Sequence, residues 1–268
     1  MILELLEYLS TNCPSYARRL GYLREAVAIK ARHRRQCEAW GPHLARSRAV
    51  VNAAANGCVR RRTALVLGSG LLLDIPLGAL SAAFERVILV DVVHLRQARR
   101  IAARYPNVSL TSEDITGLAA DLDARLRAGW RGAPVPAPAL FQDDDGIDLV
   151  ISANVAAQLP VIPAAALRRA GADDVAVRAF CGAVVRAHLD YLAGFRGRAC
   201  LITETGREVY GRDGDIWRME DALFRVSLPQ DGLTWSWDLA PPGEVSRRYG
   251  IRNQVAGFDD FKGPVPEA

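Results

Sequence analysis

Hydrophobic and polar positions follow a helical period in the first part of the chain. An apolar stripe recurs at alternating steps of four and three residues, with arginines off the stripe, at Tyr16, Leu20, Leu23 and Val27. This spacing predicts amphipathic helix. Gly41-Pro42 interrupts the pattern and Asn56-Gly57 ends it, so we expect at least two helices. Residues 1–60 are therefore predicted to form an N-terminal helical region.

From Arg61 the pattern changes to short apolar runs that alternate with longer amphipathic stretches. We expect strands at Thr63–Leu67, Arg86–Val90, Val108–Leu110, Ile147–Ile151 and Ala199–Thr203. Helices are expected at 77–84, 94–104 and 118–126, and between the last two strands as a long stretch broken near Gly171. The proline-rich and acidic stretch 133–145 reads as a surface loop. Alternating strands and helices predict parallel pairing with right-handed crossovers.

The last part of the chain has a different pattern. Leu233–Leu239 alternates with a period of two, and Ile251–Phe258 is a second strand-like run. Two such runs joined by a turn-rich link predict an antiparallel hairpin at one edge of the sheet. The predicted fold class is α/β, with a helical region at 1–60. A Rossmann-like open sheet, mostly parallel with an antiparallel edge hairpin, follows at 61–268.

Composition places the chain among ordinary globular proteins, since half of its 268 residues are apolar and 24% are charged. The five cysteines are odd in number and form no CxxC pair. This pattern fits neither a zinc site nor a disulfide framework, and it predicts reduced thiols, a cytoplasmic protein and no metal. No apolar run approaches the roughly 20 residues that span a bilayer, and the N-terminus lacks a signal-peptide pattern, so we expect no membrane insertion.

Charge is distributed unevenly. Residues 1–62 hold twelve Lys or Arg against four Glu, which gives +8, whereas the remaining residues hold 22 basic and 26 acidic groups, which gives −4. Such asymmetry can mark a nucleic-acid-binding arm. No repeating aromatic platform accompanies it, so the pattern favours a helical layer with solvated arginines over nucleic-acid binding.

A glycine turn, Gly68-Ser69-Gly70, follows the first predicted strand and precedes a helix. Gly68 can adopt the backbone angles of a sharp turn, and Gly70 leaves room for a ligand beside the main chain. Leu73 stands where the dinucleotide fingerprint has its third glycine. The turn therefore predicts either a nucleotide-like ligand or a purely structural strand-to-helix connection.

Three polar side chains end the next strands. Asp91 lies 23 residues after Gly68, where a carboxylate can accept two hydrogen bonds from a ribose diol. A carboxylate at Asp114 could accept the exocyclic amine of adenine, with Ile115 against the ring. Asn154 leaves the fourth strand, toward the edge where open parallel sheets bind ligands. Each has a structural alternative, namely capping the helix that follows.

Together these motifs resemble the class I S-adenosylmethionine-dependent methyltransferases. The resemblance covers roughly residues 61–204 and rests on Leu65–Gly70, Val90-Asp91, Glu113–Ile115 and Asp148–Asn154. The edge hairpin after residue 230 agrees with the final antiparallel strand of that family.

The resemblance implies S-adenosylmethionine as the cofactor. It places the Gly68-Ser69-Gly70 turn along the methionine moiety, Asp91 on the ribose, Asp114 and Ile115 at the adenine, and Asn154 beside the reacting methyl group. The chain departs from the family at Val66, where many members carry an acidic residue, and Asp74 is a candidate substitute. It also lacks an Asn or Asp followed by two prolines and an aromatic residue, which disfavours amide and exocyclic amino nitrogens as acceptors.

Methyl transfer is an in-line displacement that depends on alignment, and a general base helps with some acceptors. The candidates for a catalytic role are Asn154, Glu204 at the end of the fifth strand, and His43 after the helix break. Glu204 has an alternative role as the cap of a turn at Gly206. His43 has an alternative as an ordinary core or surface histidine.

The sequence therefore predicts an enzyme, an S-adenosylmethionine-dependent methyltransferase that acts on a small-molecule or otherwise unidentified acceptor. Residues 1–60 would act as a lid or acceptor-binding layer. One alternative is an NAD(P)-dependent oxidoreductase, which Asp91 suits but which lacks both the third glycine and a Tyr-x-x-x-Lys pair. A second alternative is a non-catalytic binding or assembly protein of the methyltransferase fold, because fold alone does not decide activity.

Overall fold

The computed structural model describes residues 2–130 and 132–266. Its helices are α1 (Ile2–Ser10), α2 (Ser15–Leu20), α3 (Tyr22–Asn56), α4 (Leu77–Ala83), α5 (Arg96–Ala102), α6 (Ala119–Arg127), the 3₁₀ turn η1 (Ala156–Gln158), α7 (Val161–Arg169) and α8 (Asp174–Ala193). Its strands are β1 (Thr63–Leu67), β2 (Arg86–Asp91), β3 (Val108–Ser112), β4 (Ile147–Ala153), β5 (Arg198–Gly211), β6 (Ile216–Asp221), β7 (Leu233–Ala240) and β8 (Tyr249–Phe258). Within these ranges no helix is both long and apolar enough to cross a bilayer.

One sheet contains all of these strands, in the order β3-β2-β1-β4-β5-β8-β7, with β6 paired to β5 off this path. The first five strands are parallel, β8 runs antiparallel to β5, and β7 runs antiparallel to β8. The order 3-2-1-4-5 is that of doubly wound nucleotide-binding sheets. The predicted fold class, an open and mostly parallel sheet with an antiparallel edge pair, is confirmed.

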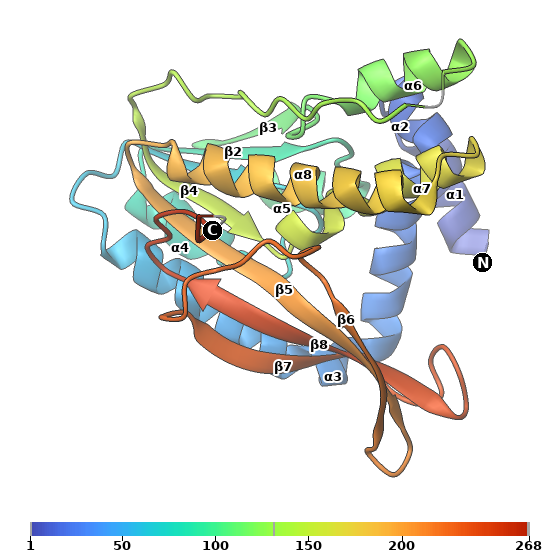
Figure 1. Cartoon of the computed structure of the whole chain (residues 1–268). Helices are drawn as coiled ribbons and strands as arrows, with labels where there is room; N and C mark the ends of the chain where they lie inside the picture. Colours follow the sequence, from blue (N-terminus) through green and yellow to red (C-terminus); the bar gives the residue numbers. More distant parts are fainter. Residues whose placement is uncertain (1, 131, 267–268) are drawn as a thin grey trace.

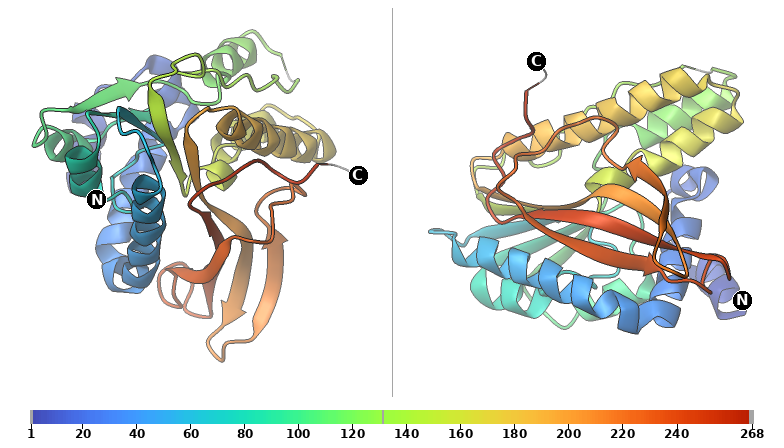
Figure 2. Two further views of the ribbon diagram at one scale, coloured as in Figure 1. Left: turned by 90° about the vertical axis from the view of Figure 1, so that its left-hand side faces the viewer. Right: turned by 60° about the horizontal axis from the view of Figure 1, so that its bottom comes forward.

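Helices cover both faces of the sheet, as the continuous apolar strands require. In Figure 2, α3 and α8 lie on opposite sides of the strands. Val51 of α3 belongs to one apolar cluster with Val66 of β1. Leu189 of α8 belongs to the other cluster, with Leu65 of β1. Adjacent residues of β1 therefore point into two different cores, and all five residues of this strand are buried.

The helical N-terminal region contains a bend, but not at the predicted position. Helix α3 runs through Gly41-Pro42, and its non-helical residue is Gln36, with φ −118° and ψ 22°. Figure 1 shows α3 changing direction along its length. Arg35 and Gln36 both donate hydrogen bonds to the carboxylate of Glu244 in the β7–β8 link. These bonds hold the bent segment against the β7–β8 link.

Strands β5 and β6 were not fully predicted. The expected strand at 199–203 continues to Gly211, and β6 pairs with this extension from Gly206 to Tyr210. Most of β6 is exposed, including Ile216, Trp217 and Met219. Its apolar side chains mark no buried face, so the periodicity that identifies buried strands is absent here.

His43 lies in the packing between α3 and β7. The Nε1–H group of Trp235 donates to Nδ1 of His43 over 3.0 Å, and the His43 ring stacks on Trp237 with centroids 4.0 Å apart. His43 is 1% exposed, and burial lowers its pKa to about 3. It is therefore a neutral core residue and not a candidate general base. The tryptophan pair fills the core, as their alternation indicates.

We predict that His43 makes folding stability dependent on pH. Between its ordinary pKa of about 6.5 and its native pKa of about 3, only the unfolded chain binds the proton, so stability falls as the pH drops below about 6.5. His43→Asn keeps an acceptor for Trp235 but does not titrate. The loss of unfolding free energy between pH 7.5 and 5.5, from urea denaturation, should be about 1.4 kcal/mol smaller in the variant. An equal loss in both proteins would contradict this assignment.

Candidate functional site

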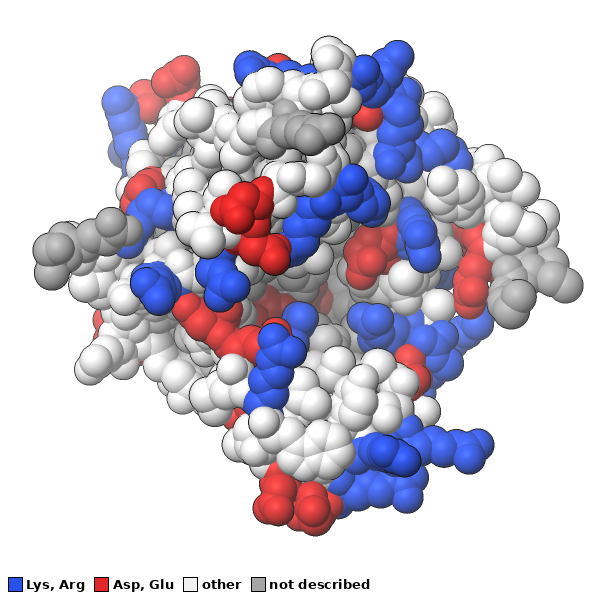
Figure 3. Space-filling view, turned by 45° about the vertical axis from the view of Figure 1, so that its right-hand side comes forward, with Lys and Arg blue, Asp and Glu red and all other residues white. Residues whose placement is uncertain are grey.

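The carboxyl ends of the parallel strands form one edge of the sheet, and the polar residues singled out in the sequence lie there. The turn after β1, Asp91 at the end of β2, the loop after β3 and Asn154 after β4 all leave this edge. Figure 3 shows the molecule with acidic side chains recessed near the middle of the face in view, and with Lys and Arg around them. Open parallel sheets bind ligands in a crevice at this edge.

The turn after β1 needs glycine at its first position. Gly68 has φ +65°, and a Cβ there would come within 2.5 Å of a Val155 methyl group. Gly70 is also left-handed, with φ +51°, but a Cβ there would make only an ordinary contact, 3.8 Å from the carbonyl oxygen of Gly68. The next left-handed residue is Leu72, with φ +60°, one position before the place of the missing third glycine at Leu73. Tight packing thus explains Gly68, whereas Gly70 leaves room beside the backbone.

Asp91 joins this turn to β2 by a hydrogen bond. One carboxylate oxygen accepts the N–H of Gly70 over 2.7 Å, and the other accepts the N–H of Val93 over 3.1 Å. Ser69 also bonds to β2 through its backbone N–H. Burial raises the pKa of Asp91, and the two N–H groups and His94 oppose that rise. A carboxylate offers about four acceptor positions, so Asp91 retains capacity for the two hydroxyls of a ribose.

In the structure Asp114 takes the alternative role, and its side chain caps the start of helix α6. Its carboxylate accepts hydrogen bonds from the N–H and hydroxyl of Thr116, and from the N–H groups of Leu118 and Ala119 at the start of α6, at 2.6–2.9 Å. These donors fill its acceptor positions, which leaves no free site for an adenine amine. Ile115 is buried in an apolar cluster. The sequence-based assignment of Asp114 to adenine therefore lacks support in this geometry.

Asn154 links the end of β4 to the loop before α4. It has φ +54°, a left-handed conformation that Asn tolerates better than most residues, and its side-chain N–H donates to Asp74 over 2.6 Å. Its side-chain oxygen is buried and has no hydrogen-bond partner within the described residues. Burial raises the pKa of Asp74, and the contact with Asn154 opposes this.

Glu204 lies on β5 beside these two residues. It is 2% exposed, one of its oxygens accepts the side-chain N–H of Gln158 over 3.0 Å, and the other has no partner among the residues described. Burial raises the pKa of Glu204, and the negative charge of Asp74 adds to the rise. No turn follows at Gly206, because β5 continues through it after a register shift. We call Asp74, Asn154, Gln158 and Glu204 the acidic floor.

Two tyrosines that the sequence reasoning did not assign to the site lie next to it. Burial and the negative charges of Asp114 and Glu113 raise the pKa of Tyr16 to about 12. Burial raises the pKa of Tyr22, and the charges of Asp114 and Asp91 contribute. The phenol rings therefore lie near the carboxylates that follow β2 and β3. Tyr16 belongs to the apolar stripe seen in the sequence, whereas Tyr22 does not, and the sequence did not show which loops either ring meets.

The N-terminal helices are fastened over this edge of the sheet. Leu23 and Val27 of α3 share an apolar cluster with Leu71 after β1 and Val93 after β2. Arg19 of α2 forms a two-pronged ion pair with Asp123 of α6, with N–O distances of 2.9 and 2.6 Å, which lowers the pKa of Asp123. Helices α2 and α3 thus cover the loops that would hold an adenosine.

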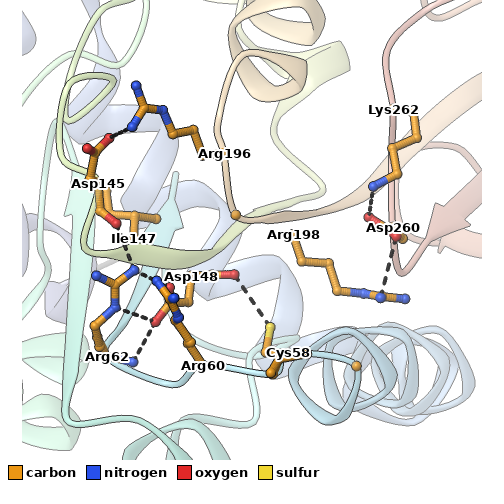
Figure 4. A pocket seen from close by; sticks show the side chains of 13 residues that line it. Cys58, Arg60, Arg62, Asp145, Ile147, Asp148, Arg196, Arg198, Asp260 and Lys262 are labelled. Carbon is orange, nitrogen blue, oxygen red and sulfur yellow. Dashed lines mark hydrogen bonds and ion pairs between the residues drawn. The ribbon is translucent and has the colours of Figure 1, made fainter.

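A cavity of about 640 Å³ lies at the opposite end of the sheet, between the amino ends of β1, β4 and β5. Figure 4 shows that its basic side chains are largely paired with acids. The pairs are Arg62–Asp148, Arg196–Asp145, Arg198–Asp260 and Lys262–Asp260. These pairs neutralise most of the charge in the cavity and connect segments at the amino ends of the strands. We therefore place the candidate site at the carboxyl edge.

We predict that Gly68→Ala destabilises the protein for two separable reasons. A left-handed alanine costs about 1–2 kcal/mol, and overpacking against Val155 adds about 1–3 kcal/mol. In a Val155→Ala background the cost should be smaller but should stay above the backbone cost alone, because the two methyl groups are removed while the Cβ of residue 155 remains 2.9 Å from the added Cβ. Urea unfolding of the four proteins in a double-mutant cycle measures this coupling. The same cost in both backgrounds would show that Val155 does not press on Gly68.

Comparisons with known proteins give distant structural likenesses. No protein-family model and no curated protein matches the chain. The chain is similar to magnesium protoporphyrin IX methyltransferase (ChlM) from Synechocystis PCC 6803 with bound SAM, at 11% identity and a TM-score of 0.36 over 95% of this chain and 90% of that one. It is also similar to the N-methyltransferase NodS from Bradyrhizobium japonicum WM9 in complex with S-adenosyl-L-homocysteine, at 11% identity and a TM-score of 0.35 over 79% and 85%.

A third likeness is to 1,6-didemethyltoxoflavin-N1-methyltransferase from Burkholderia thailandensis, at 14% identity and a TM-score of 0.34 over 87% of this chain and 89% of that one. At these TM-scores the likenesses identify neither an activity nor a ligand for this chain. Its function is therefore inferred from its own strand order and side chains.

Proposed function

We propose that the chain is an S-adenosylmethionine-dependent methyltransferase with an unidentified, small-molecule acceptor. The main support for this proposal is the combination of Asp91 at the end of β2 with the acidic floor beyond β4 and β5. Asp91 retains acceptor positions for a ribose diol, and the floor places negative charge at the other end of the same sheet edge. A nucleoside that carries a positive charge fits both features.

The acidic floor also separates this cofactor from a dinucleotide. A pyrophosphate binds backbone N–H groups at a helix N-terminus that directly follows the glycine turn. Here Leu71 and Leu72 fill that turn as buried apolar residues, and α4 begins only at Leu77. Carboxylates at Asp74 and Glu204 would repel phosphates and attract a sulfonium.

S-adenosylmethionine supplies an electrophilic methyl group when it is bound. In this proposal Asp91 holds the ribose hydroxyls, and Gly70 leaves space for the ligand beside the backbone. Tyr16 and Tyr22 enclose the adenosine end, so residues 1–60 act as a lid over the sheet domain at 61–268. Alignment in a site shielded from water is the main contribution such a protein can make to an in-line displacement.

We predict that Asp91→Ala weakens binding of S-adenosylhomocysteine about tenfold or more, because charged hydrogen bonds to two hydroxyls are lost. Isothermal titration calorimetry measures the effect. Asp91→Asn keeps the shape of the side chain and should also weaken binding, which guards against a simple folding defect. Asp121→Ala is the matched control, because Asp121 lies on the surface of α6, where it pairs with Arg125.

Unchanged affinity in both Asp91 variants would remove this residue from the ribose site. Wild-type protein that binds NAD but not S-adenosylhomocysteine would overturn the proposed function. Binding without transfer to any acceptor in a broad small-molecule screen would favour a non-catalytic role for the same fold.

A further inference from the structure

The acidic floor holds buried acceptors that lack donors. The second oxygen of Glu204 and the side-chain oxygen of Asn154 are buried, and neither has a hydrogen-bond partner in the described part of the chain. Buried polar atoms in native proteins are nearly always paired, so each such atom requires an explanation. Two of them in one cluster, next to the carboxylate of Asp74, indicate a missing donor.

The nearest basic side chains do not supply that donor. Arg48 lies close enough to Asp74 to lower its pKa, but its guanidinium donates to the backbone carbonyl of Leu73. Arg207 acts similarly on the pKa of Glu204, but its Nε donates to the side-chain oxygen of Asn253 over 3.3 Å. The acidic floor therefore has more hydrogen-bond acceptors than Arg48 and Arg207 supply with donors.

A second buried acid on the same strand, Glu208, has the protein partners expected of a structural carboxylate. Glu208 is 5% exposed, and its carboxylate accepts the side-chain N–H of Gln254 over 2.7 Å and lies 3.9 Å from Arg252. Both of its oxygens thus have protein groups nearby. Glu204 is similarly buried, but no Lys or Arg of the described ranges forms an ion pair with it, and an unpaired buried charge is strongly unfavourable. This contrast assigns Glu204 to a ligand and not to packing.

We propose that Asp74, Asn154 and Glu204 form a recognition site for an alkylammonium group. An ammonium has three N–H donors and one positive charge. The cluster offers three acceptors, namely the Asp74 carboxylate, the Asn154 oxygen and the free Glu204 oxygen. Many members of the resembling family carry an acidic residue where this chain has Val66. The proposed site would supply that negative charge from other residues.

The inference rests on the proposed function for the source of the ammonium. That source is either the amino group of the cofactor's methionine moiety or the amino group of the methyl acceptor. Glu204→Gln distinguishes them, since it removes the charge and keeps the shape. Glu208→Gln is the matched control on the same strand.

The first experiment titrates S-adenosylhomocysteine and 5′-methylthioadenosine into the three proteins by calorimetry. The two compounds share the adenosine and the thioether, but only the former carries an ammonium. If the cofactor supplies the group, Glu204→Gln weakens S-adenosylhomocysteine roughly tenfold or more and leaves 5′-methylthioadenosine unchanged. Glu208→Gln should bind both compounds as the wild type does.

The second experiment titrates benzylammonium, with benzyl alcohol as the uncharged probe, into protein saturated with S-adenosylhomocysteine. If the acceptor supplies the ammonium, the wild type binds benzylammonium more tightly than benzyl alcohol, and Glu204→Gln abolishes that preference. The affinity for S-adenosylhomocysteine then stays unchanged. Asp74→Asn should reproduce whichever pattern Glu204→Gln shows.

Thermal unfolding provides a readout that needs no ligand. Without ligand, Glu204→Gln should be at least as stable as the wild type, because it removes an unpaired buried carboxylate, whereas Glu208→Gln should be less stable. The proposal is overturned if Glu204→Gln lowers stability as Glu208→Gln does, or if it changes neither titration. If the wild type binds neither adenosine compound, the proposed function is wrong. The ammonium site is then tested alone, by titrating benzylammonium into protein without cofactor.

Discussion

The parallel alignment of β1, β2, β3, β4 and β5 is the constraint on which the rest of the structure depends. Parallel strands that are covered on both faces end at a common edge, and the loops that leave them must turn back toward the helices. Polar side chains at those ends are held close together although they are far apart in sequence. The bonds from Gly70 to Asp91 and from Asn154 to Asp74 join three strand ends across this edge.

The N-terminal helices make two separate sets of apolar contacts. The later part of α3 covers a face of the sheet, where His43 stacks on Trp237. The earlier part, with α2, packs on the loops after β1 and β2 and brings Tyr16 and Tyr22 near their carboxylates. The bend at Gln36 separates these two surfaces and is held by Glu244. The bent helix α3 therefore contributes both to the layer on the sheet and, together with α2, to the cover over the strand-end loops.

The acidic floor shows how a site can oppose stability. Glu208 has protein partners, whereas Glu204 and Asn154 each keep a buried oxygen that is unpaired among the described residues. An unpaired buried acceptor costs free energy in the unliganded protein and releases it when a donor arrives. A fold selected only for stability would pair or remove such groups. Their retention beside Asp74 is the clearest mark of a binding role in this molecule.

Local features were determined by the sequence itself. Continuous apolar runs identified the parallel strands, and the glycine turn and Asp91 were located because neighbours along the chain decide turn geometry and strand ends. Long-range contacts decided the rest. His43 entered the core because Trp235, which is distant in sequence, lies opposite it, whereas Asp114 caps α6 through contacts within a few residues, the alternative that the local sequence also offered. Only the tertiary structure could bring Asp74, Asn154 and Glu204 together, since their pairing depends on strand order and not on spacing.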